Sequence, residues 1–170
     1  MVLALGGLVA AGCGGSTETV TVTETRTTTE TVTAPAASLL PEAVDRTRGG
    51  LLAAAKAGDY DALEPYVTDR LSYSFGGPFE GGAIAYWKHL EQTTDERPLA
   101  QLARVLQLAP TISMGSYVWP WAYSVPANEL TAYERRLLGP LADSYAGESY
   151  YGWRAGIAPD GTWIFFVAGD

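Results

Sequence analysis

The sequence of 170 residues is poor in the side chains that most metal and nucleophilic sites require. It has one Cys and one His, which excludes a disulfide within the chain, a Cys-rich zinc site and a centre with several His ligands. Basic residues number 11 against 19 acidic ones, for a net charge of −8, and no basic run occurs. This balance argues against nucleic acid and against anionic lipid as electrostatic partners. The sequence predicts no metal and no cofactor.

Long apolar runs are absent too. Residues 1–12, MVLALGGLVAAG, form a short apolar stretch that stops at Cys13. A membrane-spanning helix needs about 20 such residues, whereas the apolar segment of a signal peptide needs roughly 7–15. The stretch is therefore predicted to be a signal peptide.

The residues around this boundary, Leu8-Val9-Ala10-Ala11-Gly12-Cys13, resemble the lipobox of bacterial lipoproteins, in which small residues precede a Cys that carries a lipid after cleavage. The resemblance implies that Cys13 is lipidated. It also implies that the protein is anchored by this lipid on the extracytoplasmic face of a bacterial membrane.

Residues 13–38 read as a tether. The segment 16–33, STETVTVTETRTTTETVT, repeats Thr, Glu and Val, and nothing in it is apolar enough to form a core. β-Branched Thr also disfavours helix. We expect a disordered spacer between the lipid and a single globular domain over 39–170.

The domain is expected to begin with helices and to end with strands. Helical spacing and capping residues predict helical segments over 42–57, 60–67, 82–92, 98–108 and 128–145, the last interrupted at Gly139-Pro140. Gly49 and Gly50 inside the first of these predict a kink or close packing. Alternating patterns predict strands over 71–75, 112–123, 150–158 and 163–168, the last two joined by a Pro159-Asp160-Gly161-Thr162 hairpin turn. The fold class is α+β, with a curved antiparallel sheet and a C-terminal hairpin.

This order of elements, with Ala-Gly-Asp-Tyr-Asp-Ala-Leu at 57–63 between the first two helices, resembles the NTF2-like, SnoaL-type cone fold. The last residues, including Phe166-Val167-Ala168-Gly169-Asp170, are similar to the endings of uncharacterised secreted bacterial proteins. The first resemblance implies a cone-shaped pocket. In its enzymes, such as those like ketosteroid isomerase, the pocket holds a carboxylate general base with Tyr or His beside it.

Residues for such an enzyme are present but form no motif. The carboxylates considered are Glu80, Asp143 and Glu148, and the possible partners are Tyr73, Tyr86 and His89. Glu80 also fits a charge at a helix N-terminus, and His89 fits a surface or core-edge residue. No Gly-x-Ser-x-Gly elbow occurs, so no catalytic residue is assigned.

Aromatic residues are abundant after residue 72. A regular strand over 112–123 would place four rings on one face, those of Tyr117, Trp119, Trp121 and Tyr123. Rings on a sheet most often fill the layer between sheet and helix. They also suit a cleft for an apolar or sugar-like ligand. In the last strand, Trp163 and Phe165 are predicted to share a face.

Pro120 cannot donate to a central ladder, so the strand is expected to be interrupted there and the neighbouring indoles to lie at an open end. The candidate ligand-binding residues are Tyr86, Trp87, Trp119 and Trp121. The favoured hypothesis is a lipid-anchored envelope protein with a non-catalytic domain that binds a ligand or a partner. A SnoaL-type enzyme and a module that docks on another envelope protein are the alternatives.

Overall fold

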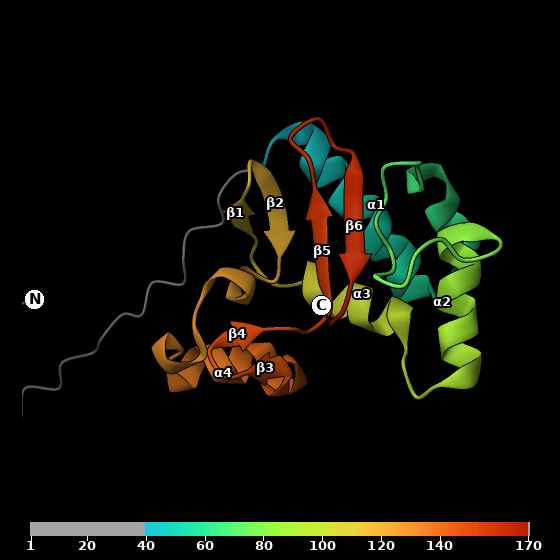
Figure 1. Cartoon of the computed structure of the whole chain (residues 1–170). Helices are drawn as coiled ribbons and strands as arrows, with labels where there is room; N and C mark the ends of the chain where they lie inside the picture. Colours follow the sequence, from blue (N-terminus) through green and yellow to red (C-terminus); the bar gives the residue numbers. More distant parts are fainter. Residues whose placement is uncertain (1–39, 170) are drawn as a thin grey trace, which may run out of the picture. The chain divides into compact units, whose positions relative to one another are not determined.

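The computed structural model describes residues 40–169 (Figure 1). Helices come first in the chain, and antiparallel strands close it, so the predicted α+β class is confirmed. The helical segments are α1 (Glu42–Ala57), η1 (Asp61–Tyr66), α2 (Gly82–Thr93), α3 (Pro98–Leu106), η2 (Trp121–Ser124), η3 (Ala127–Glu129), α4 (Ala132–Leu138) and η4 (Gly139–Ser144). The strands are β1 (Thr111–Ser113), β2 (Ser116–Trp119), β3 (Tyr145–Ala146), β4 (Ser149–Tyr150), β5 (Arg154–Ile157) and β6 (Trp163–Val167).

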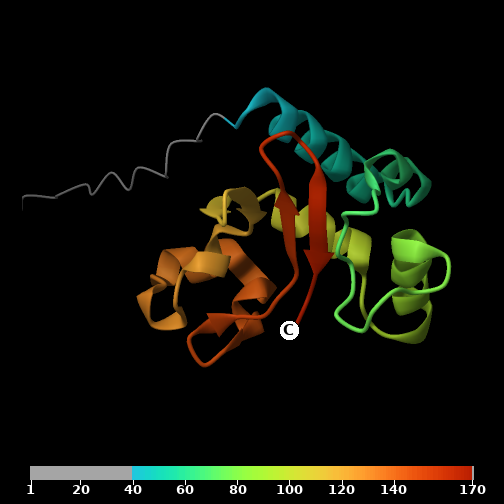
Figure 2. The same cartoon turned by 45° about the horizontal axis from the view of Figure 1, so that its top comes forward.

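Four strands form the main sheet in the order β1-β2-β5-β6, and every neighbouring pair is antiparallel. Helices α1 and α3 pack on each other and on β5. Figure 1 shows both helices behind β5 and β6, and in Figure 2 α3 lies behind the two strands while α1 passes behind the turn of their hairpin. The face of the sheet that they cover carries Trp119, Ala155 and Phe166, which share a register level and are at most 1% exposed. The core therefore lies between this face and the two helices.

Helix α1 places its apolar residues where the 3.6-residue period predicts. Val44 and Leu51 are fully buried, and the hydroxyl of Thr47 donates to the carbonyl oxygen of Gly161 at 2.7 Å. This bond ties the helix to the turn of the β5–β6 hairpin, where the predicted Pro-Asp-Gly-Thr turn is found. The helix and the hairpin thus stabilise each other.

Packing against Tyr66 accounts for one of the two adjacent glycines in α1. A Cβ atom at Gly50 would lie 1.7 Å from the hydroxyl oxygen of Tyr66, whereas one at Gly49 would meet nothing within 4 Å. The close approach of η1 to α1 therefore requires Gly only at position 50. The expected close packing is confirmed there.

This asymmetry predicts opposite effects for two neighbouring substitutions. Gly49→Ala should raise the free energy of unfolding by about 0.5–1 kcal/mol, because Ala is the better helix former and meets no neighbour. Gly50→Ala should lower it, because the Tyr66 ring must leave its place and this costs more than the helix gains. Urea unfolding of both variants measures the difference. If the two variants were stabilised equally, a Cβ atom at position 50 would not clash with Tyr66 as the structure indicates.

The region predicted as one strand over 112–123 is instead a hairpin followed by a short helix. Strand β1 turns at Met114 and Gly115 into β2, which ends at Trp119. Pro120 follows, as expected for an interruption of the ladder, and η2 begins at Trp121. The prediction that four aromatic rings share one strand face is therefore wrong beyond Trp119.

Strand β6 contains a bulge that the alternation did not predict. Ile157 pairs with Trp163, but Gly156 pairs with Phe165, so Ile164 is an extra residue between the two pairs. The bulge places Trp163 and Phe166 on the helix-covered face and turns Phe165 to the other face, over Gly156. The prediction that Trp163 and Phe165 share a face is wrong for this reason.

The segment predicted as a strand over 71–75 makes a single parallel bridge with β6. The backbone N–H of Ser72 donates to the carbonyl oxygen of Ile164, and the N–H of Phe166 donates to the carbonyl oxygen of Ser72. These bonds satisfy backbone groups at the bulge. They also bring the following loop alongside the end of β6.

Residues 126–151 form a separate corner of the domain at the lower left of Figure 1. Thr131 begins α4 with a capping box, since its hydroxyl accepts from the N–H of Glu134 and the Glu134 carboxylate accepts from the N–H of Thr131. The predicted strand over 150–158 is divided into β4 and β5 by residues 151–153.

Candidate functional site

A cavity with a volume of about 560 Å³ lies beyond the end of β6. We call it the aromatic cavity. Its wall comes from the loop 73–79, from α2, and from the residues that precede β5 and end β6. The aromatic members of the wall are Tyr73, Phe75, Phe79, Tyr86 and Trp153.

Three rings form a continuous surface on one side of the aromatic cavity. The ring centroid of Tyr86 lies 5.6 Å from that of Tyr73 and 5.6 Å from that of Phe79. The hydroxyl oxygen of Tyr73 accepts a hydrogen bond from the backbone N–H of Phe79 at 2.9 Å. Tyr73 begins the loop 73–79 and Phe79 ends it. The bond therefore links the two ends of the loop 73–79.

Trp153 also lines the aromatic cavity. Its ring packs on Phe166 of the core with the centroids 4.6 Å apart, and its indole N–H donates to the carboxylate of Glu96 at 2.9 Å. Glu96 is the one charged residue in the described lining, and no Lys or Arg belongs to it. Such a wall disfavours anions and suits the face of an uncharged ring or chain.

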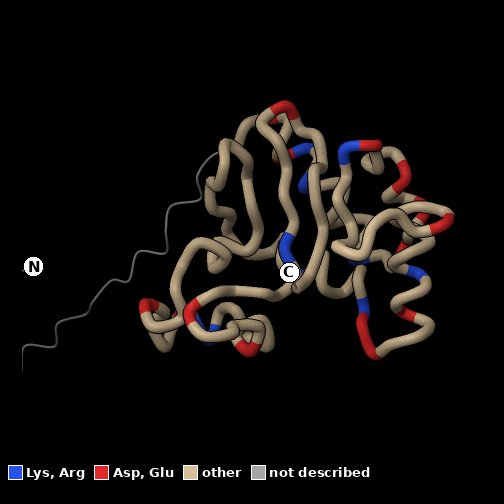
Figure 3. Tube along the Cα trace, viewed as in Figure 1, with Lys and Arg blue, Asp and Glu red and all other residues tan. Residues whose placement is uncertain are grey.

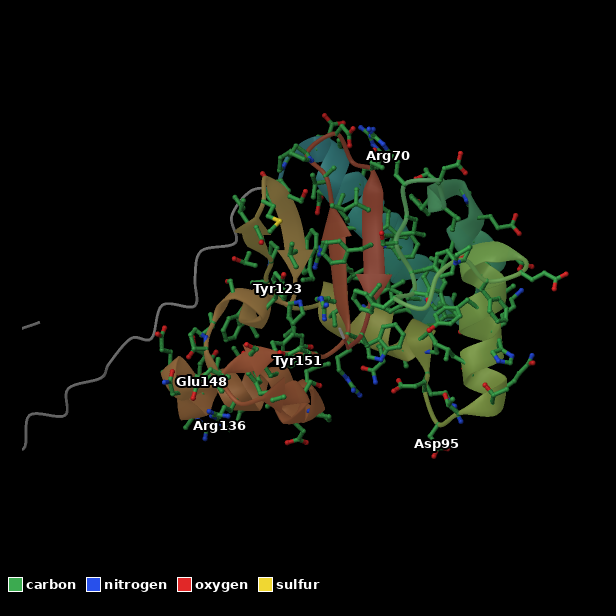
Figure 4. The ribbon with its side chains drawn as sticks, in the orientation of Figure 1. Arg70, Asp95, Tyr123, Arg136, Glu148 and Tyr151 are labelled. Carbon is green, nitrogen blue, oxygen red and sulfur yellow. The ribbon has the colours of Figure 1, made fainter. Side chains whose placement is uncertain are left out.

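The second cavity has a volume of about 390 Å³ and lies beside β4. We call it the tyrosine cavity, because Tyr123, Tyr150 and Tyr151 belong to its lining. It also contains Glu148, whose carboxylate accepts the N–H of Asn128 at 2.8 Å, and Arg154. Figure 4 labels Tyr123, Glu148 and Tyr151 in this corner of the domain.

The structure separates the four residues predicted to bind a ligand. Tyr86 lines the aromatic cavity. Trp87 and Trp119 are 0% exposed and belong to the core, where the Trp87 ring packs on Trp163 and Phe166 at 5.4 Å each. Trp121 is half-buried and lines neither cavity.

Neither of the two cavities combines Trp119 or Trp121 with Tyr86 or Trp87, although the sequence predicted such a cleft. Trp119 is the last residue of β2 and pairs with Ala155 on the helix-covered face, so its indole is sealed in the core. Trp121 leaves the strand because η2 begins there. Of the four residues, Tyr86 alone lines either of these two cavities.

The sequence patterns did not predict Phe75, Phe79 and Trp153 as lining residues. The available signal was the Gly76-Gly77-Pro78 turn, which lies between two Phe residues and presents both on one loop. Trp153 could not be found in this way, because the pattern predicted it to lie within a continuous strand.

The carboxylates considered for general-base chemistry do not line the aromatic cavity. Glu80 and Asp143 are exposed, and Glu148 belongs to the tyrosine cavity. Tyr73 and Tyr86 do line the aromatic cavity, whereas His89 is exposed and its ring lies 5.2 Å from that of Phe79.

Cys13 lies outside the described residues. Within 40–169, no group of three or more His, Cys, Asp or Glu is placed to hold a metal ion.

Comparison with protein families, with curated proteins and with solved structures finds no match to this chain. In the part of the chain that the structure describes, no helix has both the length and the apolarity to cross a membrane.

Proposed function

We propose that this chain is a lipid-anchored protein of the bacterial cell envelope whose domain binds an uncharged, ring-containing or acyl ligand in the aromatic cavity without catalysis. The observation that carries the proposal is the lining itself, with five aromatic side chains, one carboxylate and no cation. A volume of about 560 Å³ lies in the range of small-molecule sites.

The charge of the domain supports a neutral ligand. The chain carries a net charge of −8, and Glu96 adds a negative charge at the wall of the cavity. An anion entering there would meet repulsion with no cation to offset it. An apolar ring or chain gains by removal of its surface from water, at about 25 cal/mol for each Å² buried, and by stacking on the rings.

The proposed anchor rests on the residues that precede the described domain. The lipobox-like run before Cys13 and the Thr-rich segment after it support a lipid and a spacer. The order of the elements supports an NTF2-like or cystatin-like relationship, since helices precede an antiparallel sheet that ends in a hairpin. Helices α3 and α4 would be additions to that plan.

A SnoaL-type enzyme is the less supported alternative. It needs a carboxylate base inside the pocket, and Glu96 is the carboxylate that the aromatic cavity offers. This residue is exposed and already accepts the Trp153 indole N–H. Among the described residues, the buried polar or charged side chains are those of Thr47 and Arg154, and neither is a carboxylate.

The test uses N-phenyl-1-naphthylamine, an uncharged aromatic probe whose fluorescence rises in apolar sites. We expect the probe to bind the wild-type domain, and Tyr86→Ala to weaken binding about tenfold through loss of stacking and of buried area. Ala168→Trp should abolish binding, because Ala168 lines the cavity and the larger side chain fills it.

Tyr133→Ala is the matched control. Tyr133 is 44% exposed on α4 and lines neither cavity, so its loss should leave the affinity unchanged. Circular dichroism establishes that each variant is folded. If Tyr86→Ala and Ala168→Trp bind the probe as tightly as Tyr133→Ala does, the aromatic cavity is not the binding site.

A further inference from the structure

Arg154 is the only charged residue in the four strands of the main sheet, and it is buried. It is 9% exposed, at the start of β5, and it pairs with Val167 of β6. In Figure 3 the charged segments lie mostly on helices and loops, and the strands are mostly uncharged. A buried guanidinium in an otherwise apolar sheet costs free energy unless an anion or hydrogen-bond acceptors meet it.

Groups of the described residues accept few of the hydrogen bonds that this guanidinium can donate. Its one hydrogen bond is a long one, 3.4 Å, to the carbonyl oxygen of Gly152. Two rings flank it, those of Phe75 and Tyr123, each with its centroid 5.6 Å from the guanidinium carbon. Cation–π contacts to both rings stabilise the charge but use none of the N–H donors. Within residues 40–169, no Asp or Glu oxygen lies within 4 Å of Arg154.

The neighbouring tyrosines do not supply the missing anion. The hydroxyl of Tyr150 donates to the carbonyl oxygen of Trp153 at 3.0 Å, and burial raises the pKa of this phenol well above its ordinary value. Burial raises the pKa of Tyr145 as well. Both side chains therefore stay neutral at physiological pH. The donors of Arg154 remain available to a ligand on the side where the residue lines the tyrosine cavity.

We propose that the tyrosine cavity binds a small carboxylate-bearing molecule, with its carboxylate on the guanidinium of Arg154 and its apolar body against Tyr123 and Tyr151. The planar fork of an Arg side chain matches the two oxygens of a carboxylate. A volume of about 390 Å³ accommodates a single aromatic ring with its substituent. This site is distinct from the aromatic cavity. It is proposed to bind an anion, whereas the aromatic cavity is proposed to bind an uncharged ligand.

The charges in the lining of the tyrosine cavity favour a carboxylate over a phosphate. Glu148 brings a negative charge into the lining, and Arg154 is the one cation there. A dianion would be balanced by one positive charge while it faces Glu148 and a chain of net charge −8. A monoanion pairs fully with Arg154.

The experiment compares benzoate with benzamide, which has the same shape and no charge. In titrations followed by NMR of the isotopically labelled domain, we expect benzoate to bind at least about tenfold more tightly and to shift the signals of residues around Tyr151. Arg154→Lys keeps the charge and most of the stem but loses the fork, so it should weaken benzoate about tenfold. Tyr86→Ala should leave benzoate binding unchanged, which makes the result independent of the aromatic cavity.

Glu148→Gln gives a second test that does not touch the buried Arg. The amide oxygen can still accept the Asn128 N–H, so the local structure is preserved, and the loss of a negative charge should tighten benzoate severalfold at low salt. No binding of benzoate, equal binding of benzoate and benzamide, or an affinity that neither Arg154→Lys nor Glu148→Gln changes would overturn the proposal.

Asp170 offers a distinguishing variant. It lies outside the described residues and follows Gly169, whose N–H donates to the carbonyl oxygen of Tyr151 at 2.7 Å. If Asp170→Asn binds benzoate and the wild-type protein does not, the chain's own carboxylate occupies Arg154 and an external ligand is ruled out. Equal binding by both proteins supports the external ligand.

Discussion

Trp163→Ala should lower the free energy of unfolding by about 3–5 kcal/mol, the range for truncation of a large aromatic residue in a core. The side chain is 1% exposed and packs on Trp87 and on Phe166, with ring centroids 5.4 and 6.1 Å apart. These rings join β6 to α2, so the cavity left by the indole cannot collapse without moving both elements. Urea unfolding followed by far-UV circular dichroism measures the loss.

Phe165→Ala is the matched comparison two residues along the same strand. Its ring is half-buried and covers Gly156 on the other face of the sheet, so we expect a loss of less than about 2 kcal/mol. The difference between the two variants follows from the bulge at Ile164. A loss for Phe165→Ala as large as that for Trp163→Ala would show that strict alternation holds in β6 and that the bulge is absent.

The main helices could be predicted because local signals specify them. The first helix begins after Pro41 and ends at Gly58, and the spacing of Val44, Thr47 and Leu51 already marks its buried side. The β5–β6 hairpin was equally accessible, since Pro-Asp-Gly-Thr favours a tight turn in almost any context.

The details of the sheet could not be predicted, because they depend on pairing between distant segments. The bulge in β6 is stabilised by the backbone of Ser72, which lies more than ninety residues earlier in the chain. Periodicity within a strand contains no information about such a partner. The end of β2 was the exception, since Pro120 marks it in the sequence itself.

The candidate sites were harder to predict than the fold for a related reason. Aromatic residues that follow a clear strand alternation, such as Trp119, are buried in the core. Apart from Tyr86 on α2, those that line the aromatic cavity come from the loop 73–79 and from the residue before β5, where no periodicity applies. Tyr86 was predicted to form a cleft with Trp119 or Trp121, and it lines the aromatic cavity from α2, next to the buried Trp87.

The two cavities differ in the charge of their walls, and this difference bears on function. The aromatic cavity carries Glu96 without a cation, and the tyrosine cavity carries Arg154 beside Glu148. Phe75 connects them, since its ring belongs to the wall of the first and flanks the guanidinium of the second.

Cys13→Ser should move the protein from the membrane fraction to the soluble fraction of the cell. The lipobox-like run implies that the Cys13 thiol receives a diacylglyceryl group, and two acyl chains suffice for stable anchoring. A hydroxyl at this position is not a substrate for that transfer. The acidic chain gains nothing from an anionic lipid surface, so the lipid on Cys13 is the proposed source of membrane attachment.

Fractionation of cells that express each protein, followed by a salt and carbonate wash, measures this directly. Ser16→Ala, three residues along the tether, is the control and should remain in the membrane fraction. Incorporation of labelled palmitate into the wild-type protein and its loss in Cys13→Ser provide an independent readout, because Cys13 is the one Cys of the chain. If the Cys13→Ser protein stays in the membrane fraction after the wash, the attachment does not depend on this thiol and the proposed anchor is wrong.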